Sequence, residues 1–96
     1  MSTEAESNVD TEALRMKLEV SVDTGQVTAA AALTLTQATK RWVVNSWRHY
    51  MVEITAGNGQ GEFAEILANT ADTLTIDHAW TVIPDDRSHY RILVWR

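Results

Sequence analysis

The sequence predicts an all-β protein, a small sandwich or partly open barrel of about seven short antiparallel strands. Stretches of alternating apolar and polar residues recur along the 96 residues, and turn-forming residues separate them at intervals of ~8–12 positions. After residue 23, no segment of useful length has the apolar spacing of a helix. A chain this short makes one small domain, which we assign to residues 13–96, preceded by an acidic N-terminal arm at residues 1–12.

The clearest strand pattern comes first. Residues 13–23 alternate without a break, and their apolar positions are Leu14, Met16, Leu18, Val20 and Val22. Successive side chains of a strand point to opposite faces, so this pattern predicts a half-buried strand. A helix would bring Leu14 and Leu18 onto one face but would leave Met16 on another.

Turn chemistry follows this strand at Asp23-Thr24-Gly25, and the alternation resumes from Val27 to Leu35. We therefore expect residues 13–36 to form one extended hairpin ahead of a compact β module at residues 37–96. The run of alanines at residues 29–32 is the weak part of the second arm, because alanine is depleted in strands. It fits either a loose connection or a tightly packed contact between subunits.

Three glycines spaced two apart lie between strand-like segments, at Gly57, Gly59 and Gly61. Glycine adopts positive φ without steric cost, so we expect these residues to form the tip of a hairpin. A phosphate-binding loop would need a helix after the glycines and a different spacing, such as GxGxxG. The glycines therefore predict a turn and not a nucleotide site.

Large side chains in the strand-like segments predict the core. The expected core anchors are Trp47, Tyr50, Ile54, Ile66, Leu74, Trp80, Tyr90 and Ile92. Trp95 is the better candidate for an interface, and the pattern assigns no place to Trp42. With four tryptophans and one phenylalanine, the chain could also use indole rings as a sugar-binding face, although filling the core of a small domain is the ordinary use of such rings.

Candidate catalytic and metal-binding groups form no recognised motif. His49, His78 and His89 could supply a zinc site, but none of them stands at a recognised ligand spacing. The neighbours Asp85 and Asp86 lie in a turn, whereas the paired carboxylates of glycosidases stand apart across a cleft. We therefore predict that the protein is not an enzyme, and we assign no catalytic residue, cofactor or metal.

The net charge of −5 is concentrated in the N-terminal arm. Residues 1–12 carry Glu4, Glu6, Asp10 and Glu12 and no basic residue, while the rest of the chain is close to neutral. Such a segment is typical of a flexible or partner-ordered arm, and nucleic-acid binding would need a basic surface. No stretch approaches the ~18 apolar residues that cross a bilayer, so we expect no membrane association.

An extended hairpin ahead of a compact module leaves unpaired strand edges. Isolated soluble proteins block such edges, and assembling proteins use them to add strands to a neighbour. A small domain without cysteine also often depends on partners for stability. We therefore expect an interface with a partner protein and with copies of the chain, at Leu14, Met16, Leu18, Val20, Val22, Val27 and Trp95.

A series of short motifs runs from residue 34 to residue 92, nearly two thirds of the chain. Its members are Thr34-Leu35-Thr36, Lys40, Trp42, Asn45, Trp47, Tyr50, Ile54, Gly57, Gly59, Gly61, Ile66, Asn69-Thr70, Thr73-Leu74-Thr75, Trp80, Pro84-Asp85, Ser88, Tyr90 and Ile92. In this order and spacing the motifs resemble a small β-module found in structural proteins of tailed bacteriophages, among them head, neck, baseplate and tail-fibre components.

The chain departs from the pattern of that module at three positions. Glu62 and Ala64 stand where the module has Gln and Arg, and His49 stands where it has Gly before the aromatic residue of a strand. A pairing of the Gln and Arg, and a site built on it, would therefore be absent, and the glycine tip is a weaker candidate for a polar contact site.

The resemblance implies a non-catalytic building block of a virion, made in the host cytoplasm. It is expected to be a head decoration or cement protein, or a neck-tail adaptor, that docks on a major structural protein through arm and strand contacts. A short chain that begins with Met1 fits a separate subunit better than a domain of a long fibre. The alternative is a carbohydrate-binding module of a tail fibre or receptor-binding apparatus.

Overall fold

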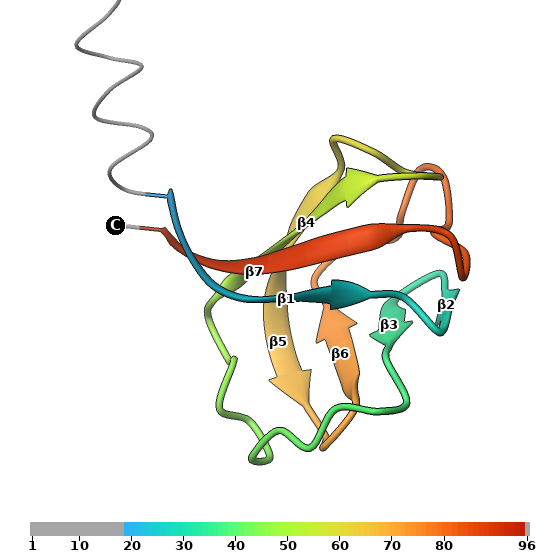
Figure 1. Ribbon diagram of the computed structural model, residues 1–96. Helices are drawn as coiled ribbons and strands as arrows, with labels where there is room; N and C mark the ends of the chain where they lie inside the picture. Colours follow the sequence, from blue (N-terminus) through green and yellow to red (C-terminus); the bar gives the residue numbers. More distant parts are fainter. Residues whose placement is uncertain (1–18, 96) are drawn as a thin grey trace, which may run out of the picture.

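The computed structural model describes residues 19–95, and all regular secondary structure in this range is β-strand (Figure 1). The all-β prediction is confirmed. No helix long and apolar enough to cross a membrane occurs among the described residues. The strands are β1 (Glu19–Gln26), β2 (Ala29–Ala31), β3 (Thr34–Thr36), β4 (Met51–Ala56), β5 (Phe63–Asn69), β6 (Thr73–Ile76) and β7 (His89–Trp95).

The strands form one antiparallel sheet in the order β1-β7-β4-β5-β6-β3-β2. The two edge strands, β1 and β2, follow each other in the chain and are joined only by Val27 and Thr28. Because so short a link must connect opposite edges, the sheet curls until these edges come close, as Figure 1 shows. The Val27 amide donates to the Ser88 carbonyl at 2.9 Å, and the Thr28 amide donates to the Thr36 carbonyl at 2.7 Å. Of the two architectures expected, the partly open barrel describes this arrangement.

The expected hairpin over residues 13–36 is wrong within the described part of the chain. Strand β1 pairs with β7, from Glu19 opposite Trp95 to Gln26 opposite His89, and β2 pairs with β3. The segment Asp23-Thr24-Gly25, expected as a turn, lies inside β1 just after a bulge. Its turn propensity is overridden by long-range contacts of Asp23 and Gly25, described below. Residues 13–18, the start of the expected hairpin, lie outside the described range.

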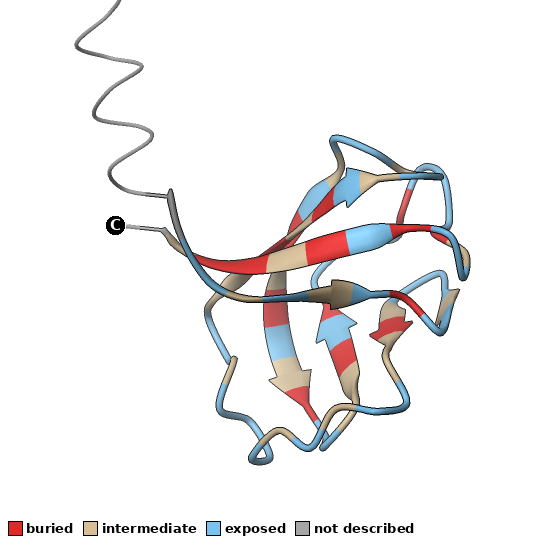
Figure 2. Cartoon of the chain, in the orientation of Figure 1, coloured by how far each residue is buried: buried red, intermediate tan, exposed pale blue. Residues whose placement is uncertain are grey.

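The core fills the inside of the curled sheet, and in β3, β4 and β6 buried positions alternate with more exposed ones (Figure 2). Of the predicted anchors, six are buried, and Trp47 and Tyr50 are partly buried against them. Val27 is only 2% exposed, so its assignment as an interface residue is wrong: the short link between the two edge strands turns its side chain inward. The buried members are Val27, Leu35, Val52, Ile54, Ala64, Ile66, Leu74, Ile76, Trp80, Tyr90 and Ile92.

The glycine run forms the tip of the β4–β5 hairpin, as predicted. Gly57, Gly59 and Gly61 have φ of 81°, 84° and 92°, which L side chains rarely adopt. A Cβ on Gly57 would lie 2.8 Å from the carbonyl oxygen of Arg87, and one on Gly59 would lie 2.9 Å from that of Val82. The tip therefore packs closely against the loop that leads to β7.

Candidate functional site: the edge of β1 and the β3–β4 loop

The candidate metal-binding histidines lie beside different partners. His49 Nδ1 is 3.2 Å from a carboxylate oxygen of Glu65, and His78 Nδ1 is 2.9 Å from one of Asp77. His89 lies on β7, where it is paired with Gln26 and Ala56. Within residues 19–95 no three His, Asp or Glu side chains are grouped so that they could hold a metal ion.

The polar residues near the glycine tip hold loops together. Ser88 is fully buried; its hydroxyl donates to the Asn58 carbonyl at 2.8 Å and accepts from the Asp85 amide at 3.1 Å. The Glu62 carboxylate accepts hydrogen bonds from the amides of Thr81 and Val82, both at 2.7 Å. Glu62 is therefore used within the fold, because a carboxylate can accept two backbone amides at once.

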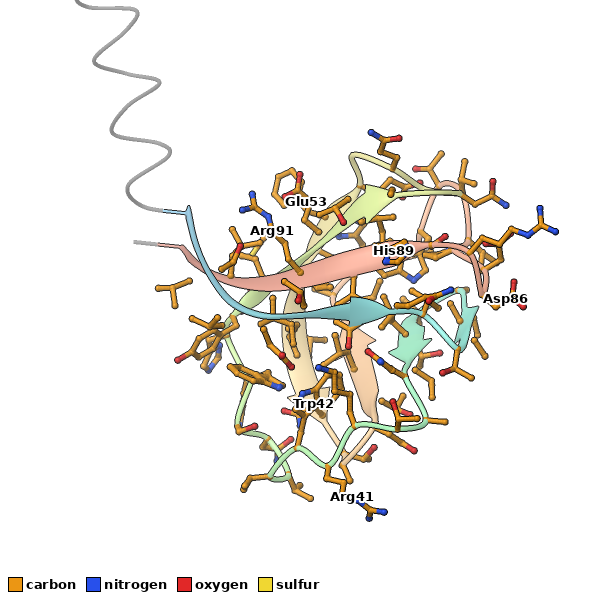
Figure 3. All side chains as sticks on the ribbon, viewed as in Figure 1. Arg41, Trp42, Glu53, Asp86, His89 and Arg91 are labelled. Carbon is orange, nitrogen blue, oxygen red and sulfur yellow. The ribbon has the colours of Figure 1, made fainter. Side chains whose placement is uncertain are left out.

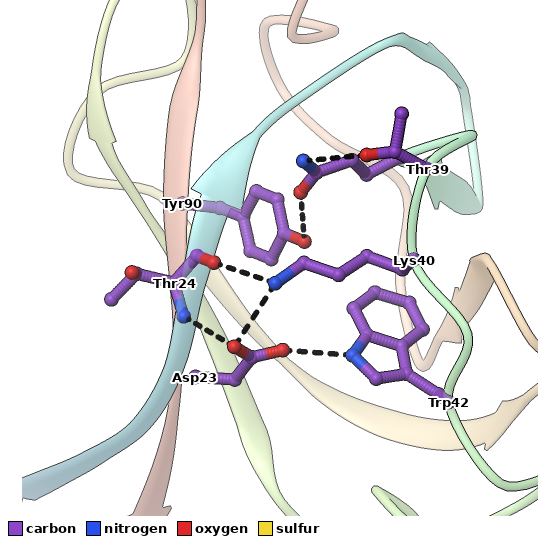
Figure 4. Close-up of polar contacts among 7 residues, drawn as sticks. Asp23, Thr24, Thr39, Lys40, Trp42 and Tyr90 are labelled. Atoms are coloured by element: carbon purple, nitrogen blue, oxygen red, sulfur yellow. Dashed lines mark hydrogen bonds and ion pairs between the residues drawn. The ribbon is translucent and has the colours of Figure 1, made fainter.

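A polar seam crosses the open side of the barrel, between β1 and the loop that connects β3 to β4 (Figure 4). One oxygen of the Asp23 carboxylate accepts from Trp42 Nε1 at 2.8 Å, and the other accepts from Lys40 Nζ at 3.0 Å and from the Thr24 amide at 3.0 Å. Lys40 Nζ also donates to the Thr24 carbonyl at 2.9 Å. These contacts tie β1 to residues that lie far along the chain.

The pKa of the Asp23 carboxyl is lower than its ordinary value. Partial burial alone raises this pKa, but the hydrogen bonds from Trp42 and Lys40, the charge of Lys40 and the Thr24 amide together outweigh burial. The carboxylate is therefore stabilised in its charged form at the seam.

Tyr90 and Gly25 form the inner layer of the seam. The Tyr90 hydroxyl donates to Gln37 Oε1 at 2.6 Å, and Gln37 Nε2 donates to Thr39 Oγ1 at 3.3 Å. A Cβ on Gly25 would collide with Gln37 Oε1 and would lie 2.8 Å from the Tyr90 hydroxyl oxygen, so a larger residue here would displace the Gln37 side chain. Burial, and secondarily the charge of Asp23, raises the pKa of Tyr90 far above its ordinary value.

The seam divides the outer edge of β1 into two halves. At Thr24 the amide and the carbonyl that face away from β7 are occupied by Asp23 and Lys40. From Glu19 to Val22, the only backbone hydrogen bonds within the described range are those to β7. We call residues 19–22 the open edge. Val22, on this edge, is 41% exposed.

Trp42, which the sequence left unassigned, and Trp47, which it placed in the core, belong to the β3–β4 loop and pack against the core. Trp42 and Trp47 meet edge to face with ring centroids 6.5 Å apart and an interplanar angle of 90°. Trp42 also meets Tyr90, and Trp47 meets Tyr50, again edge to face. Trp80 is buried and donates from Nε1 to the Thr34 carbonyl at 3.2 Å. The rings of Trp42 and Trp47 are perpendicular, so they form no coplanar platform.

The β3–β4 loop, residues 37–50, is held by asparagines. Buried Asn69 accepts from the Trp47 amide at 2.8 Å and donates to the Val43 carbonyl at 3.0 Å. Asn45 returns the contact, because its side-chain oxygen accepts from the Asn69 amide at 3.1 Å. Asn45 has φ of 60° and His49 has φ of 74°, so the loop includes two left-handed residues. The loop is thus fixed although it has no strand of its own.

The sequence pattern does not predict that the seam residues Asp23, Lys40 and Gln37 lie together. The apolar positions of β1 change phase at its bulge: Val22 is exposed, while Val27, five residues later, is buried. Asp23 therefore faces inward, although the unbroken alternation of residues 13–23 assigns it to the polar face. The signal available in the sequence was the shift of apolar residues from even to odd positions between Val22 and Val27.

The remaining predicted interface residues are described by the structure to different extents. Val22 lies on the open edge. The side chains of Val20 and Trp95 are outside what the structure describes, although their backbones pair in β1 and β7. Leu14, Met16 and Leu18 precede the described range, as does the acidic arm.

No protein-family model, curated protein sequence or solved structure matches this chain.

Proposed function

We propose that this chain is a non-catalytic structural subunit of a tailed-bacteriophage virion. It docks on a larger structural protein, a capsid, neck or tail component, by adding the open edge of β1 to a strand of that partner. The observation that carries the proposal is the uneven protection of β1. Its second half is occupied by Asp23 and Lys40, whereas residues 19–22 offer backbone groups and the exposed Val22.

The other edge of the sheet supports this choice of surface. Strand β2 contains only three residues, and very short edge strands are one way in which proteins prevent edge-to-edge pairing. A lysine on the edge is a further way, and Lys40 takes this place at the second half of β1, whereas the bulge at Val22 ends the open edge. Among the described strands, the open edge is the place where strand addition meets least obstruction.

The roles of the motif residues also support the proposal. Thr34–Thr36 form β3, the three glycines form the β4–β5 tip, and Asn69 fixes the β3–β4 loop. His49, which stands where the phage module has glycine, has the positive φ that glycine would favour. A motif whose members build the fold fits a structural module better than a catalytic one.

The carbohydrate-binding alternative has less support. A sugar platform needs exposed, coplanar rings, but Trp42 and Trp47 are perpendicular and partly buried, and Trp80 is buried. A glycan array on the free protein would test it directly.

The test compares particle association of two matched variants. Val22→Lys places a charge on the open edge, and Val82→Lys places the same charge on an exposed valine near the glycine tip. We expect wild type and Val82→Lys to co-purify with phage particles at a fixed copy number. The affinity of Val22→Lys should be about tenfold lower, which corresponds to about 1.4 kcal/mol.

Two results would contradict the proposal. One is a wild-type protein that sediments as a compact monomer and never co-purifies with particles. The other is equal association of the two lysine variants. Circular dichroism and thermal unfolding of both variants establish that the fold is retained, as expected for exposed positions.

A further inference from the structure

The β3–β4 loop presents a surface that is both basic and apolar. Val43 and Val44 are 75% and 64% exposed, the two highest values among the large apolar residues whose side chains the structure describes. Arg41 and Arg48 flank them and are exposed, and Figure 3 shows Arg41 extending away from the sheet. We call these four residues the arginine–valine surface.

The arginine–valine surface is held in place from below. Trp42 and Trp47, which adjoin the two arginines in the chain, pack against the core and touch each other edge to face. This contact brings together the two ends of the segment that carries the valines, and Arg41 and Arg48 adjoin those ends in the chain. Asn69 fixes the Val43 carbonyl and the Trp47 amide. The surface therefore loses little conformational entropy when something binds to it.

The charges of this surface are not balanced by the described residues. The ion pairs found within residues 19–95 use Lys40, His49, His78 and Arg91, and none of them includes Arg41 or Arg48. Two arginines beside two exposed valines fit a segment that carries carboxylates and a few apolar side chains.

The chain itself contains such a segment. Residues 1–12 carry Glu4, Glu6, Asp10 and Glu12, no basic residue, and one valine, Val9. We propose that in the free protein this N-terminal segment docks on the arginine–valine surface of the same chain. The proposal is independent of the proposed virion function.

The position of β1 makes the docking possible. Glu19 pairs with Trp95 at the end of β7, and Leu93, two residues earlier, pairs with Met51 at the start of β4. The β3–β4 loop ends immediately before Met51, at the same end of the sheet as Glu19. Two strand spacings separate β1 from β4, roughly 10 Å, which about three extended residues can span. Residues 13–18 can span up to about 20 Å when extended, so they reach beyond the end of the loop at Met51, and a short tether raises the effective concentration of the segment at the loop.

The experiment attaches a nitroxide spin label to the full-length variant Ser7→Cys. The chain has no cysteine, so the label has one site. Paramagnetic broadening of amide resonances in isotope-labelled protein then reports which residues the segment approaches. We expect broadening over residues 41–48 and none at Gly59, at the far tip of the β4–β5 hairpin. Raised salt should weaken it.

The matched variants reverse charge at exposed arginines. In Arg41→Glu/Arg48→Glu we expect the ratio of docked to free segment to fall about tenfold, because two exposed ion pairs become like-charge contacts. Arg87→Glu, at an exposed arginine near the Pro84 turn, should leave the broadening unchanged. Spectra of the unlabelled variants establish that the fold is intact.

Three outcomes overturn the proposal. They are the absence of broadening over residues 41–48 in the wild-type background, broadening that survives the double reversal, and broadening that appears only when spin-labelled and isotope-labelled chains are mixed. The last outcome would assign the contact to a second copy.

Discussion

At the scale of single residues, Asp23 makes more structural contacts than its polar position in the alternating pattern predicts. Aspartate is depleted in strands because its side chain competes for backbone hydrogen bonds. Here that same property is used: the carboxylate accepts from its neighbour Thr24 and from Trp42 and Lys40 across the seam. An apolar residue at this position could close the seam by packing but could not hold Lys40.

Replacing Asp23 by asparagine should destabilise the protein in a pH-dependent way. The folded state lowers the pKa of this carboxyl, so its stabilisation is present above the ordinary pKa of about 3.9 and is lost as pH falls through the lower folded value. We expect Asp23→Asn to lower the free energy of unfolding by about 1–2 kcal/mol near neutral pH, since hydrogen bonds to a charged group are lost. The difference should shrink below about pH 4. Urea unfolding at both pH values measures it.

The exposed Asp86 provides the control for this prediction. Its backbone carbonyl accepts from Gln26, and no hydrogen bond or ion pair of its side chain is found within the described residues. Asp86→Asn should leave stability unchanged at either pH. If Asp23→Asn lowers the free energy of unfolding equally at neutral and acidic pH, the charge of the seam is ruled out as the cause.

At the scale of elements, the glycine tip shows two different reasons for a glycine: a positive φ and a close contact with another segment. Gly57 and Gly61 both have positive φ, but only Gly57 lies against another part of the chain. A Cβ at Gly57 would approach Arg87 and Ser88 backbone atoms at 2.8 Å, whereas one at Gly61 would find nothing within 4 Å. The tip is therefore a turn at Gly61 and a packing contact at Gly57.

Alanine at the two positions should have unequal effects. Gly61→Ala adds only backbone strain, so we expect a loss of about 1 kcal/mol in the free energy of unfolding. Gly57→Ala adds a clash with the backbone before β7, and we expect about 3 kcal/mol in total. Chemical denaturation of both variants gives the comparison. Equal losses would mean that the tip is free of the loop before β7.

At the scale of the whole molecule, the barrel is closed by side chains where the backbone ladder ends. The sheet order leaves β1 and β2 without a mutual ladder, and the seam from Asp23 to Trp42 and from Tyr90 to Gln37 spans the gap. Closure thus depends on a few polar contacts between residues that are distant in sequence. Local opening of β1 should therefore cost less than that of an interior strand such as β4.

Amide hydrogen exchange should reveal a gradient along β1. We expect residues 19–22 to exchange faster than residues 24–26, because only the latter half is tied to the β3–β4 loop. Strand β4, in the interior of the sheet, should be the slower reference. In Asp23→Asn the difference between the halves of β1 should diminish. Uniform protection along β1 in the wild type would contradict the role of the seam.

Much of the fold can be predicted from the local pattern of residues in the sequence. Six of the eight predicted anchors are buried, and the glycine tip was placed correctly, because alternation and positive-φ preference are properties of neighbouring residues. The local pattern wrongly predicts an interface at Val27 and a turn at Asp23-Thr24-Gly25. Both errors arise from one bulge, whose local sign, the shift of apolar residues from even to odd positions, is equally consistent with a turn.

The sequence by itself determined the class of the fold, most of its core and the absence of recognised catalytic motifs, since these follow from residue spacing. The tertiary structure alone decided that β1, the first described strand, pairs with β7, the last one. It also decided that Asp23, Lys40 and Trp42 meet at a seam. The physical reason is that contacts between distant residues, such as Tyr90 over Gly25, select the pairing partner of an edge strand. A local alternation of side chains carries no information about which distant strand supplies these contacts.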